Sequence, residues 1–339
     1  MNKAEAVKNL ADQSTELVPL IELRNITRTF VTGGGIEVHA LRGITLNIYA
    51  GEFVSLIGQS GSGKSTLASA VMRLIKPPGQ VVGGRILLDG RDILAMNNEE
   101  LRRIRFAEIG LVPQGAMNSL NPVMKVWDQI ADTIRAHPSA HRTEDIEDRI
   151  NGLLNSVDLE PDVANLYPHE LSGGMRQRVC LAMAISLRPS VIIADEPTSA
   201  LDVVVQRQVF DTLDRLQAEL GIAVLLVGHD MGLMAQFVDR VGVLYAGKLI
   251  ELSSTMELFE NPLHPYTQRL IDSLPSLEER AVFRGIRGGP PSLRSLPSGC
   301  IFHPRCEQAM PHCSEIIPLL QDQPGGGAVA CHLYTEDGK

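Results

Sequence analysis

One stretch restricts what this chain can fold into more than any other: GQSGSGKS, at residues 58–65. It fits the pattern G-x-x-x-x-G-K-[ST], follows the apolar run FVSLI and opens the helix-like stretch KSTLASAVMRLI. Glycines in such a loop let backbone N–H groups surround phosphates, Lys64 brings a positive charge to the outer two, and Ser65 can ligate Mg²⁺. A chance glycine-serine turn is the alternative, and the flanking strand and helix oppose it. The residues expected to bind nucleotide here are Gly58, Ser60, Gly61, Ser62, Gly63, Lys64, Ser65 and Thr66.

The order of apolar and amphipathic segments predicts the fold class. VIIADEP and IAVLLVGHD read as buried strands, and VVVQRQVFDTLDRLQAEL between them reads as an amphipathic helix that ends at Gly221. Apolar strands that alternate with helices indicate a parallel sheet covered by helices, the α/β class. The segment 20–58 is rich in short strands, and the segment from Pro122 to about Leu187 reads as a mostly helical insert.

Two adjacent acids end the first of these strands. Asp195 is placed to hold Mg²⁺ through a water molecule, and Glu196 is placed to polarise an attacking water. Successive side chains leave a strand on opposite sides, so the two carboxylates can take separate tasks only where the strand ends and twists out. An ordinary acidic junction between strand and loop is the alternative, which the phosphate loop on the same chain disfavours.

The stretch LSGGMRQR, at residues 171–178, looks like a second site for an anion. A helix that starts with glycines presents backbone N–H groups and the positive end of its dipole, with no side chain in the way. The chain already has a better phosphate loop much nearer its N-terminus. The second loop therefore needs a different ligand, or the same ligand from another molecule.

The phosphate loop, the acid pair and the LSGG helix start resemble, on one chain, the ATP-binding subunit of an ABC transporter, over roughly residues 20–260. Minor motifs agree with this resemblance: Phe30 stands where the family stacks an aromatic ring on adenine, and Gln114, the SALD stretch at 199–202 and His229 follow in order. Alone, Phe30 on a strand would more often belong to the core. Gln114 and His229 would be ordinary polar residues at strand ends, and Gly228 stands where many relatives have Thr.

The resemblance implies a P-loop NTPase core with an N-terminal antiparallel β-subdomain and a helical insert that carries LSGG. It places an extension at 1–19, the ATPase domain at 20–259 with its helical subdomain at about 115–187, and a loop-rich C-terminal module at 260–339.

In this family two nucleotide domains meet head to tail, and each ATP lies between the phosphate loop of one and the LSGG of the other. The resemblance therefore makes Glu196 and His229 catalytic, with His229 on the γ-phosphate, and lets Gln114 complete the magnesium shell. The residues implied to contact the ATP of the neighbouring domain are Ser172, Gly173, Gly174 and Asp202.

The partners that the resemblance implies are a second ABC ATPase, identical or paralogous, two transmembrane permease subunits and an external solute-binding protein. The family docks its permeases on the segment that follows Gln114, which contains Trp127, the single tryptophan of the chain. Trp127 itself reads as a core residue. We expect a peripheral position at the cytoplasmic face of the cell membrane.

The C-terminal residues contain a cluster of four cysteines: Cys300, Cys306, Cys313 and Cys331. In a reducing cytoplasm such a cluster suggests a metal before a disulfide. Its spacing C-x₅-C-x₆-C-x₁₇-C is unlike the paired C-x₂-C of most structural zinc sites, and four thiolates are what a cubane cluster needs. The nearby His303, His312 and His332 keep a zinc site possible, and unmetallated thiols are the third alternative.

The same region resembles the C-terminal module of oligopeptide and dipeptide importer ATPases. The stretches NPLHPYTQRLIDSLP, GGPPS and GCIFHPRC carry this resemblance. Relatives with this tail have a [4Fe–4S] cluster, so the resemblance favours iron and sulfur over zinc. It implies peptide import, with uptake of another small solute such as nickel as the alternative.

Composition and charge weigh against other function classes. The net charge of −9 opposes a general nucleic-acid binder, because binding many phosphates needs clustered Lys and Arg. A soluble ABC ATPase acting on nucleic acid or ribosomes would usually have two cassettes or a long coiled coil, and neither is visible here. A catalytically silent subunit is opposed by the intact motifs. The first twenty residues contain no apolar run of signal-peptide length, and no run reaches the roughly 18 residues that span a bilayer. We therefore expect a cytoplasmic chain whose membrane association comes through a partner.

Overall fold

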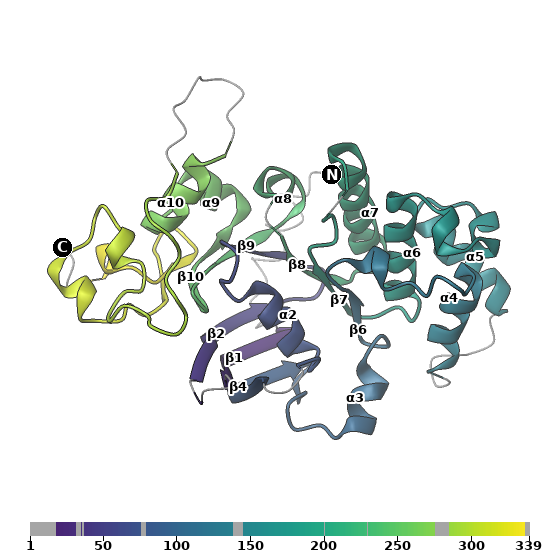
Figure 1. Cartoon of the computed structure of the whole chain (residues 1–339), viewed down its shortest axis with the longest axis horizontal. Helices are drawn as coiled ribbons and strands as arrows, with labels where there is room; N and C mark the ends of the chain where they lie inside the picture. The colour runs from purple at the N-terminus through teal and green to yellow at the C-terminus, as the bar shows by residue number, and fades with distance from the viewer. Residues whose placement is uncertain are drawn as a thin grey trace.

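The structure is a computed structural model that describes residues 18–31, 35, 37–75, 79–137, 145–199, 201–228, 230–274 and 285–335. In this part of the chain an eight-stranded sheet has the order β11-β12-β10-β9-β3-β8-β7-β6. Five of its strands, β10, β9, β8, β7 and β6, are labelled in Figure 1. β9, β3, β8, β7 and β6 are parallel, whereas β10, β12 and β11 join antiparallel. The strands are β3 (Phe53–Ile57), β6 (Ile109–Val112), β7 (Val191–Asp195), β8 (Ala223–Val227), β9 (Arg240–Tyr245), β10 (Lys248–Ser254), β11 (Gln321–Asp322) and β12 (Ala328–Val329).

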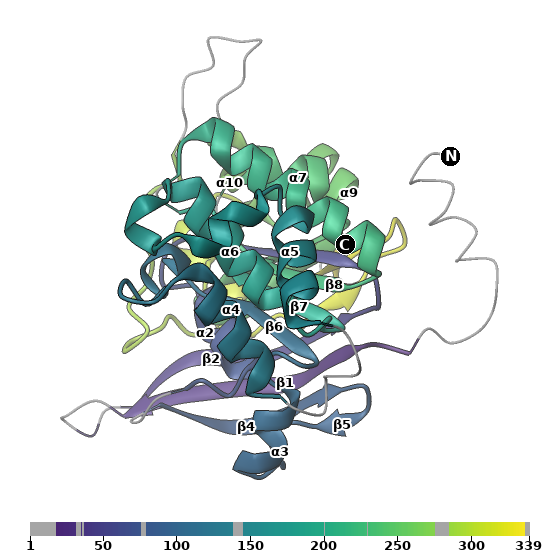
Figure 2. The same ribbon diagram turned by 90° about the vertical axis from the view of Figure 1, so that its right-hand side faces the viewer.

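A second, antiparallel sheet has the order β2-β1-β4-β5. Its strands are β1 (Ile21–Val31), β2 (Glu37–Ile48), β4 (Gly79–Leu88) and β5 (Arg91–Asp92). In Figure 2 the antiparallel sheet lies at the bottom, and helices α5, α6 and α7 lie toward the top. The predicted β-rich N-terminal part and the predicted parallel sheet are both present.

The helices of the described residues are α2 (Lys64–Val71), α3 (Asn98–Ile104), α4 (Val126–Arg135), α5 (Ile146–Ser156), α6 (Gly173–Ile185), α7 (Val203–Leu220), α8 (Met231–Phe237), α9 (Thr255–Glu260) and α10 (Pro265–Asp272). The bounds of α7 agree with the helix predicted from its sequence. Asp202 caps its start by accepting the backbone N–H of Val205, and Gly221 ends it with φ 64°. None of the helices described is long and apolar enough to cross a membrane.

Side chains of the central strands alternate between two apolar cores. On β3, Phe53 and Ile57 pack into a core that also holds residues of α4–α8 and of the C-terminal region. Val54 and Leu56 pack into a second core, with α2 and the antiparallel sheet. Burial on both faces explains why these strands read as continuous apolar runs.

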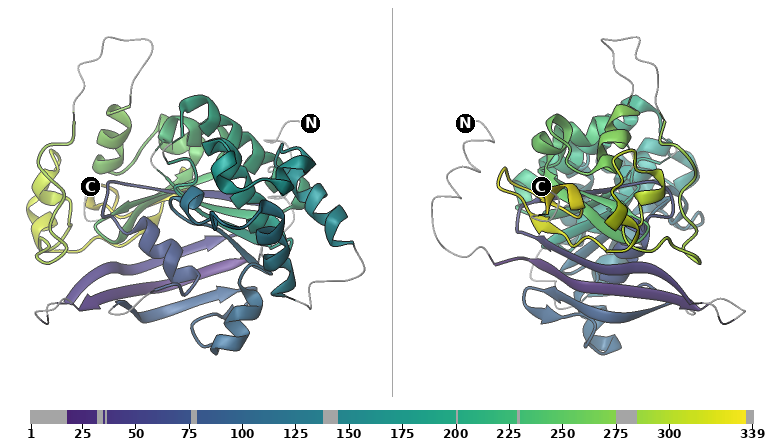
Figure 3. Two further views of the ribbon diagram at one scale, coloured as in Figure 1. Left: turned by 45° about the vertical axis from the view of Figure 1, so that its right-hand side comes forward. Right: turned by 90° about the vertical axis from the view of Figure 1, so that its left-hand side faces the viewer.

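The C-terminal residues continue the fold beyond α10. They form short 3₁₀ turns at His303–Arg305, Pro311–Ser314 and His332–Tyr334, and supply β11 and β12. Figure 3 shows them on the opposite side of the molecule from α4 and α5. Helix α10 is not evident from apolar periodicity. Its signals are local, because His264 caps it by accepting the N–H of Tyr266 and Pro265 occupies its first position.

Candidate nucleotide-binding site

The phosphate loop joins β3 to α2, and two of its glycines have no substitute. Gly58 has φ +144°, and a Cβ there would lie 2.2 Å from the carbonyl oxygen of Leu244. Gly63 has φ +106°, and a Cβ there would lie 2.8 Å from the carbonyl oxygen of Ala40. Both positions combine a conformation that L side chains avoid with a backbone atom too close for any side chain. The loop therefore packs directly against the backbones of β2 and β9.

The loop borders a cleft of ≈ 610 Å³, a size suited to a small-molecule ligand. The predicted residues in its lining are Gly58, Ser60, Gly61, Gly63, Lys64, Ser65, Thr66, Gln114 and Glu196. Sequence reasoning did not select the rest of the lining, which consists of Ile57, Gln59, Met231 and Leu270. Segments far apart in the chain thus meet at one cleft.

Lys64 is nearly buried, with 7% of its surface exposed. Its Nζ donates hydrogen bonds to the carbonyl oxygens of Gly58 at 2.7 Å and Gln59 at 3.3 Å. Burial lowers the pKa of Lys64, while the carboxylates of Glu196 and Asp195 oppose this shift. An ammonium group in such a site is poorly solvated, so its attraction to phosphate oxygens is stronger than in water.

Two of the three magnesium ligands expected from the sequence, Ser65 and Asp195, contact each other at the end of β7. Ser65 Oγ donates a hydrogen bond of 2.8 Å to Oδ1 of Asp195. Burial raises the pKa of Asp195, and the nearby Glu196 adds to this, while the bond from Ser65 and the charge of Lys64 act against it. A hydroxyl and a carboxylate side by side are the hard oxygen donors that Mg²⁺ prefers.

Glu196 has a backbone conformation that is rare for a side chain of its size. Its φ is +48°, and its N–H donates to the carbonyl oxygen of Val227 at 2.8 Å. Its carboxylate accepts a 2.8 Å hydrogen bond from Nε2 of Gln114. This left-handed turn directly after β7 separates the acid pair, since Asp195 contacts Ser65 and Glu196 contacts Gln114. Backbone strain of this kind is common at functional sites.

Some predicted residues do not line the cleft. Phe30 lies on β1, where the guanidinium of Arg28 is 4.1 Å from its ring centroid. Ser62 is buried, and its Oγ has no hydrogen-bond partner among the described residues. His229 is outside the described residues.

The LSGG stretch begins α6, and, within the part of the chain that the structure describes, it contributes nothing to the cleft lining. Ser172 is the N-cap, and its Oγ accepts the backbone N–H of Met175 at 3.2 Å. Gly173 is the first helical residue, and Gly174 is buried. Asp202 is likewise an N-cap, at the start of α7. The residues predicted to contact the ATP of a neighbouring domain therefore lie at two helix starts, those of α6 and α7, and not in the lining of the phosphate-loop cleft.

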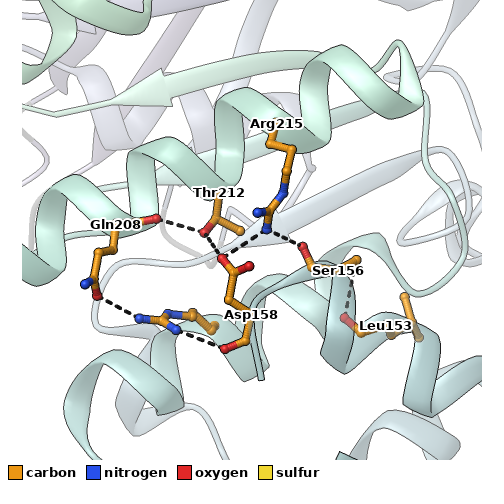
Figure 4. Close-up of polar contacts among 7 residues, drawn as sticks. Leu153, Ser156, Asp158, Gln208, Thr212 and Arg215 are labelled. Carbon is orange, nitrogen blue, oxygen red and sulfur yellow. Dashed lines mark hydrogen bonds and ion pairs between the residues drawn. The ribbon is translucent and has the colours of Figure 1, made fainter. Parts of the chain in front are cut away.

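A polar network joins α7 to the helical insert (Figure 4). The side chain of Arg215 pairs with Oδ2 of Asp158 at 3.0 Å, and the hydroxyl of Thr212 donates to the same oxygen at 3.3 Å. The hydrogen bond from Arg215 lowers the pKa of Asp158. From α6, Arg178 donates to the carbonyl oxygen of Asp158 at 3.1 Å and to the side chain of Gln208 at 2.8 Å. The network fixes the relative position of the helices that begin with LSGG and after SALD.

The C-terminal cysteines line one small cavity together with His264, His303 and His332. The backbone N–H of Cys300 donates to the carbonyl oxygen of Cys313 at 2.8 Å. Among the described residues, however, no three His, Cys, Asp or Glu side chains converge so that they could hold a metal ion. The side-chain arrangement therefore does not support the predicted iron–sulfur cluster, although it brings the four thiols to one place.

Comparison with known proteins agrees with this geometry. Residues 41–199 match a family described as "ABC transporter", and residues 250–313 match "Oligopeptide/dipeptide transporter, C-terminal region". The dipeptide transport ATP-binding protein DppD of Caldanaerobacter subterraneus is 43% identical over 94% of this chain and 98% of its own length. The chain belongs to the ABC transporter ATPases. Within that family, the oligopeptide transport ATP-binding protein OppD of Salmonella typhimurium is 40% identical over 90% of this chain and 91% of its own.

Solved structures of ABC ATPases have the same fold. The dimeric structure of MJ0796, a bacterial ABC transporter cassette, aligns with a TM-score of 0.61 and 34% identity, over 69% of this chain and 98% of that one. A second structure of that cassette is a post-hydrolysis state bound to ADP and Pi, with a TM-score of 0.61 and 33% identity, over the same shares of the two chains. The predicted fold class and the predicted ATPase are confirmed.

The residues of the cleft lining that were not predicted differ in whether their position in the sequence indicates a place near the nucleotide. Gln59 occupies a variable position of the phosphate loop, so its presence in the lining could have been expected. Met231 begins α8, next to the predicted His229. Leu270 belongs to α10, far along the chain, and nothing in its local sequence connects it to a nucleotide.

Proposed function

We propose that this ABC ATPase hydrolyses ATP to power the import of oligopeptides or dipeptides. The observation that carries the proposal is one cleft lined by Lys64, Ser65 and the Glu196–Gln114 pair, with Asp195 behind Ser65 and hydrogen-bonded to it. The C-terminal match and the names of the relatives favour a peptide as the solute.

The roles of the residues follow from their contacts. Lys64 and the N–H groups of the loop and of the start of α2 bind the phosphates, because both are positive in a poorly solvated site. Glu196 accepts a proton from the attacking water, and the hydrogen bond from Gln114 orients its carboxylate. His229 contacts the γ-phosphate. Ser65, Gln114 and, through water, Asp195 would hold Mg²⁺, which neutralises charge on the phosphates.

A second ATPase subunit completes the site in this proposal. Among the residues that the structure describes, those of the LSGG and SALD helix starts do not line the cleft of their own chain, and a helix N-terminus is suited to bind phosphate. Ser172, Gly173, Gly174 and Asp202 then contact ATP held by the partner. The related MJ0796 cassette, whose solved structure is dimeric, supports this pairing.

We further propose that the chain works with two transmembrane permease subunits, which receive solute from an external binding protein, and that the segment 117–130 contacts this transporter. These contacts would place the chain peripherally at the cytoplasmic face of the membrane. The support is that the segment has exposed side chains on a backbone held in place by hydrogen bonds. Val123 is 78% exposed, whereas the buried Gln129 accepts the N–H of Asn121 and donates to its carbonyl oxygen. Trp127 packs at the edge of the core, with Arg135 5.2 Å from its ring centroid.

For the cysteine cavity we propose a [4Fe–4S] cluster, with zinc as the alternative. Its support is the chemistry of the set: four thiols from separate turns line one cavity in a region with little core of its own. A cluster there would act as a covalent brace between those turns. Anaerobic purification should yield about four iron atoms per chain. Stoichiometric zinc, or no metal, would replace this assignment.

Reconstitution tests the transport function. The chain, purified with its permeases and binding protein in proteoliposomes, should take up labelled di- and oligopeptides only when ATP is supplied on the side of the ATPase, and a Lys64→Ala complex should take up none. Charge reversal at Lys125 should lower uptake while ATP hydrolysis continues, because it affects the segment 117–130. Uptake of nickel but not of peptides would change the solute, and ATP hydrolysis stimulated by RNA rather than by permeases would reject the transporter role.

A further inference from the structure

Gln59, the second residue of the phosphate loop, is held by the C-terminal region at two points. Its backbone N–H donates to the hydroxyl oxygen of Tyr266 at 2.9 Å, and Nη1 of Arg305 donates to its side-chain Oε1 at 3.1 Å. A third contact comes from within the loop, because Nζ of Lys64 donates to its carbonyl oxygen at 3.3 Å. The N–H, carbonyl and side chain of Gln59 therefore all have defined partners.

Tyr266 is itself fixed by packing. It is completely buried, and its ring centroid lies 4.7 Å from that of Tyr245 and 5.5 Å from that of Phe302. Burial raises the pKa of Tyr266 to about 12. Its hydroxyl thus stays neutral and available as an acceptor at any physiological pH. Tyr266 belongs to the stretch HPYT, which the sequence analysis connects with the importer family. In the structure it accepts a hydrogen bond from the phosphate loop.

Arg305 is fixed even more completely. Five hydrogen bonds use its guanidinium, matching the five N–H donors that the group carries. Besides Gln59, their acceptors are the hydroxyl of Tyr245 and the carbonyl oxygens of Ile286, Arg287 and Gly288. A planar guanidinium group whose five N–H donors are all used can hardly rotate, so Arg305 holds the side chain of Gln59 in one position.

We propose that Tyr266 and Arg305 are positioning residues for the phosphate loop, through which the C-terminal region sets the affinity for nucleotide. A glycine-rich loop loses much conformational freedom when it surrounds phosphates, and contacts that restrict it beforehand reduce this cost. Leu270 of α10, which lines the cleft, brings the same region to the nucleotide directly. The inference rests on the proposed binding of nucleotide at this loop.

Two variants with matched controls test the proposal on the full chain. Tyr266→Phe removes only the acceptor oxygen, and Tyr334→Phe is its control, since the Tyr334 hydroxyl donates to the carbonyl oxygen of Leu263 in the same region, away from the loop. Arg305→Met is paired with Arg287→Met, whose side chain is 86% exposed. Both test variants should raise the Kd for Mg-ADP, measured by calorimetry, roughly 3- to 30-fold, the worth of one hydrogen bond to a held or charged group. The controls should bind as the wild type does.

A split between KM and kcat separates positioning from a general loss of structure. In the complex with permeases, the test variants should raise the KM for ATP while kcat at saturating ATP stays within about twofold. Arg305→Lys keeps one donor for Gln59 and should recover part of the affinity. Gln59→Leu should weaken binding, and its effect should not add to that of Arg305→Met, because both remove the same bond.

The outcomes are distinguishable. Wild-type affinity in both Tyr266→Phe and Arg305→Met overturns the inference, and so does an equal loss in Tyr334→Phe, which would indicate a structural effect only. If Tyr266→Phe does not fold by circular dichroism, the Arg305 contact alone decides the inference: Arg305→Met and Gln59→Leu both remove it, and wild-type affinity in both overturns the proposal. Equal binding of Mg-ADP by the wild type and Lys64→Ala would instead reject the proposed nucleotide site.

Discussion

Gly174 of α6 approaches Val205 of α7 so closely that a Cβ on Gly174 would lie 2.7 Å from Cγ1 of Val205. Real Cβ atoms do not make contacts this short, so another residue at position 174 requires the Val205 side chain or one of the two helices to shift. The second glycine of LSGG therefore lets α6 and α7 pack closely at this point. In addition, a glycine at this helix start leaves no side chain in the way of a phosphate group.

Gly174→Ala should lower the free energy of unfolding by about 1–3 kcal/mol, the usual cost of overpacking, partly offset by the better helix propensity of alanine. Val205→Ala removes the two methyl groups that the new Cβ meets. The double variant should therefore be more stable than Gly174→Ala in urea titrations, and should recover ATPase activity. Equal stability of the wild type and Gly174→Ala would contradict the contact.

Glu196→Gln should reduce ATP turnover roughly 10²- to 10⁴-fold, the usual contribution of a positioned base. The glutamine keeps an oxygen that can accept the hydrogen bond from Gln114, so the loop geometry and ATP binding should persist. Turnover and nucleotide binding are measured together, with Glu99→Gln, at an exposed position on α3, as the control. A variant that turns over at the wild-type rate would assign the base elsewhere.

Mixing two inactive chains tests whether LSGG acts across a dimer. Lys64→Ala lacks the phosphate lysine, and Ser172→Arg places a long cation at the LSGG helix start. If the chain pairs with itself, one of the two composite sites in the mixed dimer retains both elements, so the mixture should hydrolyse ATP when neither variant alone does. An active wild-type homodimer without any such recovery would mean that each site is built within one chain.

His264 should make stability depend on pH. It is buried next to Phe302, and burial lowers its pKa from 6.5 to about 3. Between these values the unfolded chain binds a proton that the folded chain does not, so stability present above pH 6.5 is lost as the pH falls toward 3. His264→Asn keeps an acceptor for the N-cap of α10 but does not titrate. Its Tm should therefore fall less steeply than that of the wild type below pH 6.5.

The surroundings of His264 do not disturb this comparison. Buried Glu251, whose pKa is raised by burial, accepts the N–H groups of Leu263 and His264 and contributes a slope of opposite sign. The cysteines of the same cavity, Cys300, Cys306, Cys313 and Cys331, and His303 and His332 are present in both proteins. Parallel Tm curves for the two proteins would show that His264 does not titrate as its burial requires.

Local patterns predicted the elements that depend on local causes. The phosphate loop is recognisable because its glycines are required by positive φ and close backbone contacts, as at Gly58 and Gly63. The bounds of α7 follow from a capping Asp and a terminal Gly. Such signals lie within a few residues of what they determine.

The remainder of the site depends on contacts between distant residues. The left-handed turn at Glu196 has no sequence marker, since glycine or asparagine is the usual sign of positive φ. Gln59 forms hydrogen bonds with Tyr266 and with Arg305, and each of these residues is more than two hundred positions away in the sequence. The stretch HPYT is typical of one group of proteins, but the hydrogen bond between Tyr266 and Gln59 is visible only in the fold.

Strand β12 covers the outer side of β10. Glu251 and Leu252 of β10 pair there with Val329 and Ala328, so this part of β10 is not an open edge. The backbone N–H of Ala330 adds a bond to the carbonyl oxygen of Ile250 at 2.8 Å. An uncovered strand edge is a template on which other chains can align. Shortening the chain before residue 320 should therefore expose the long edge of β10 in place of the two-residue edge strand β11, and such a product should elute as aggregates in size-exclusion chromatography even where its phosphate loop is intact.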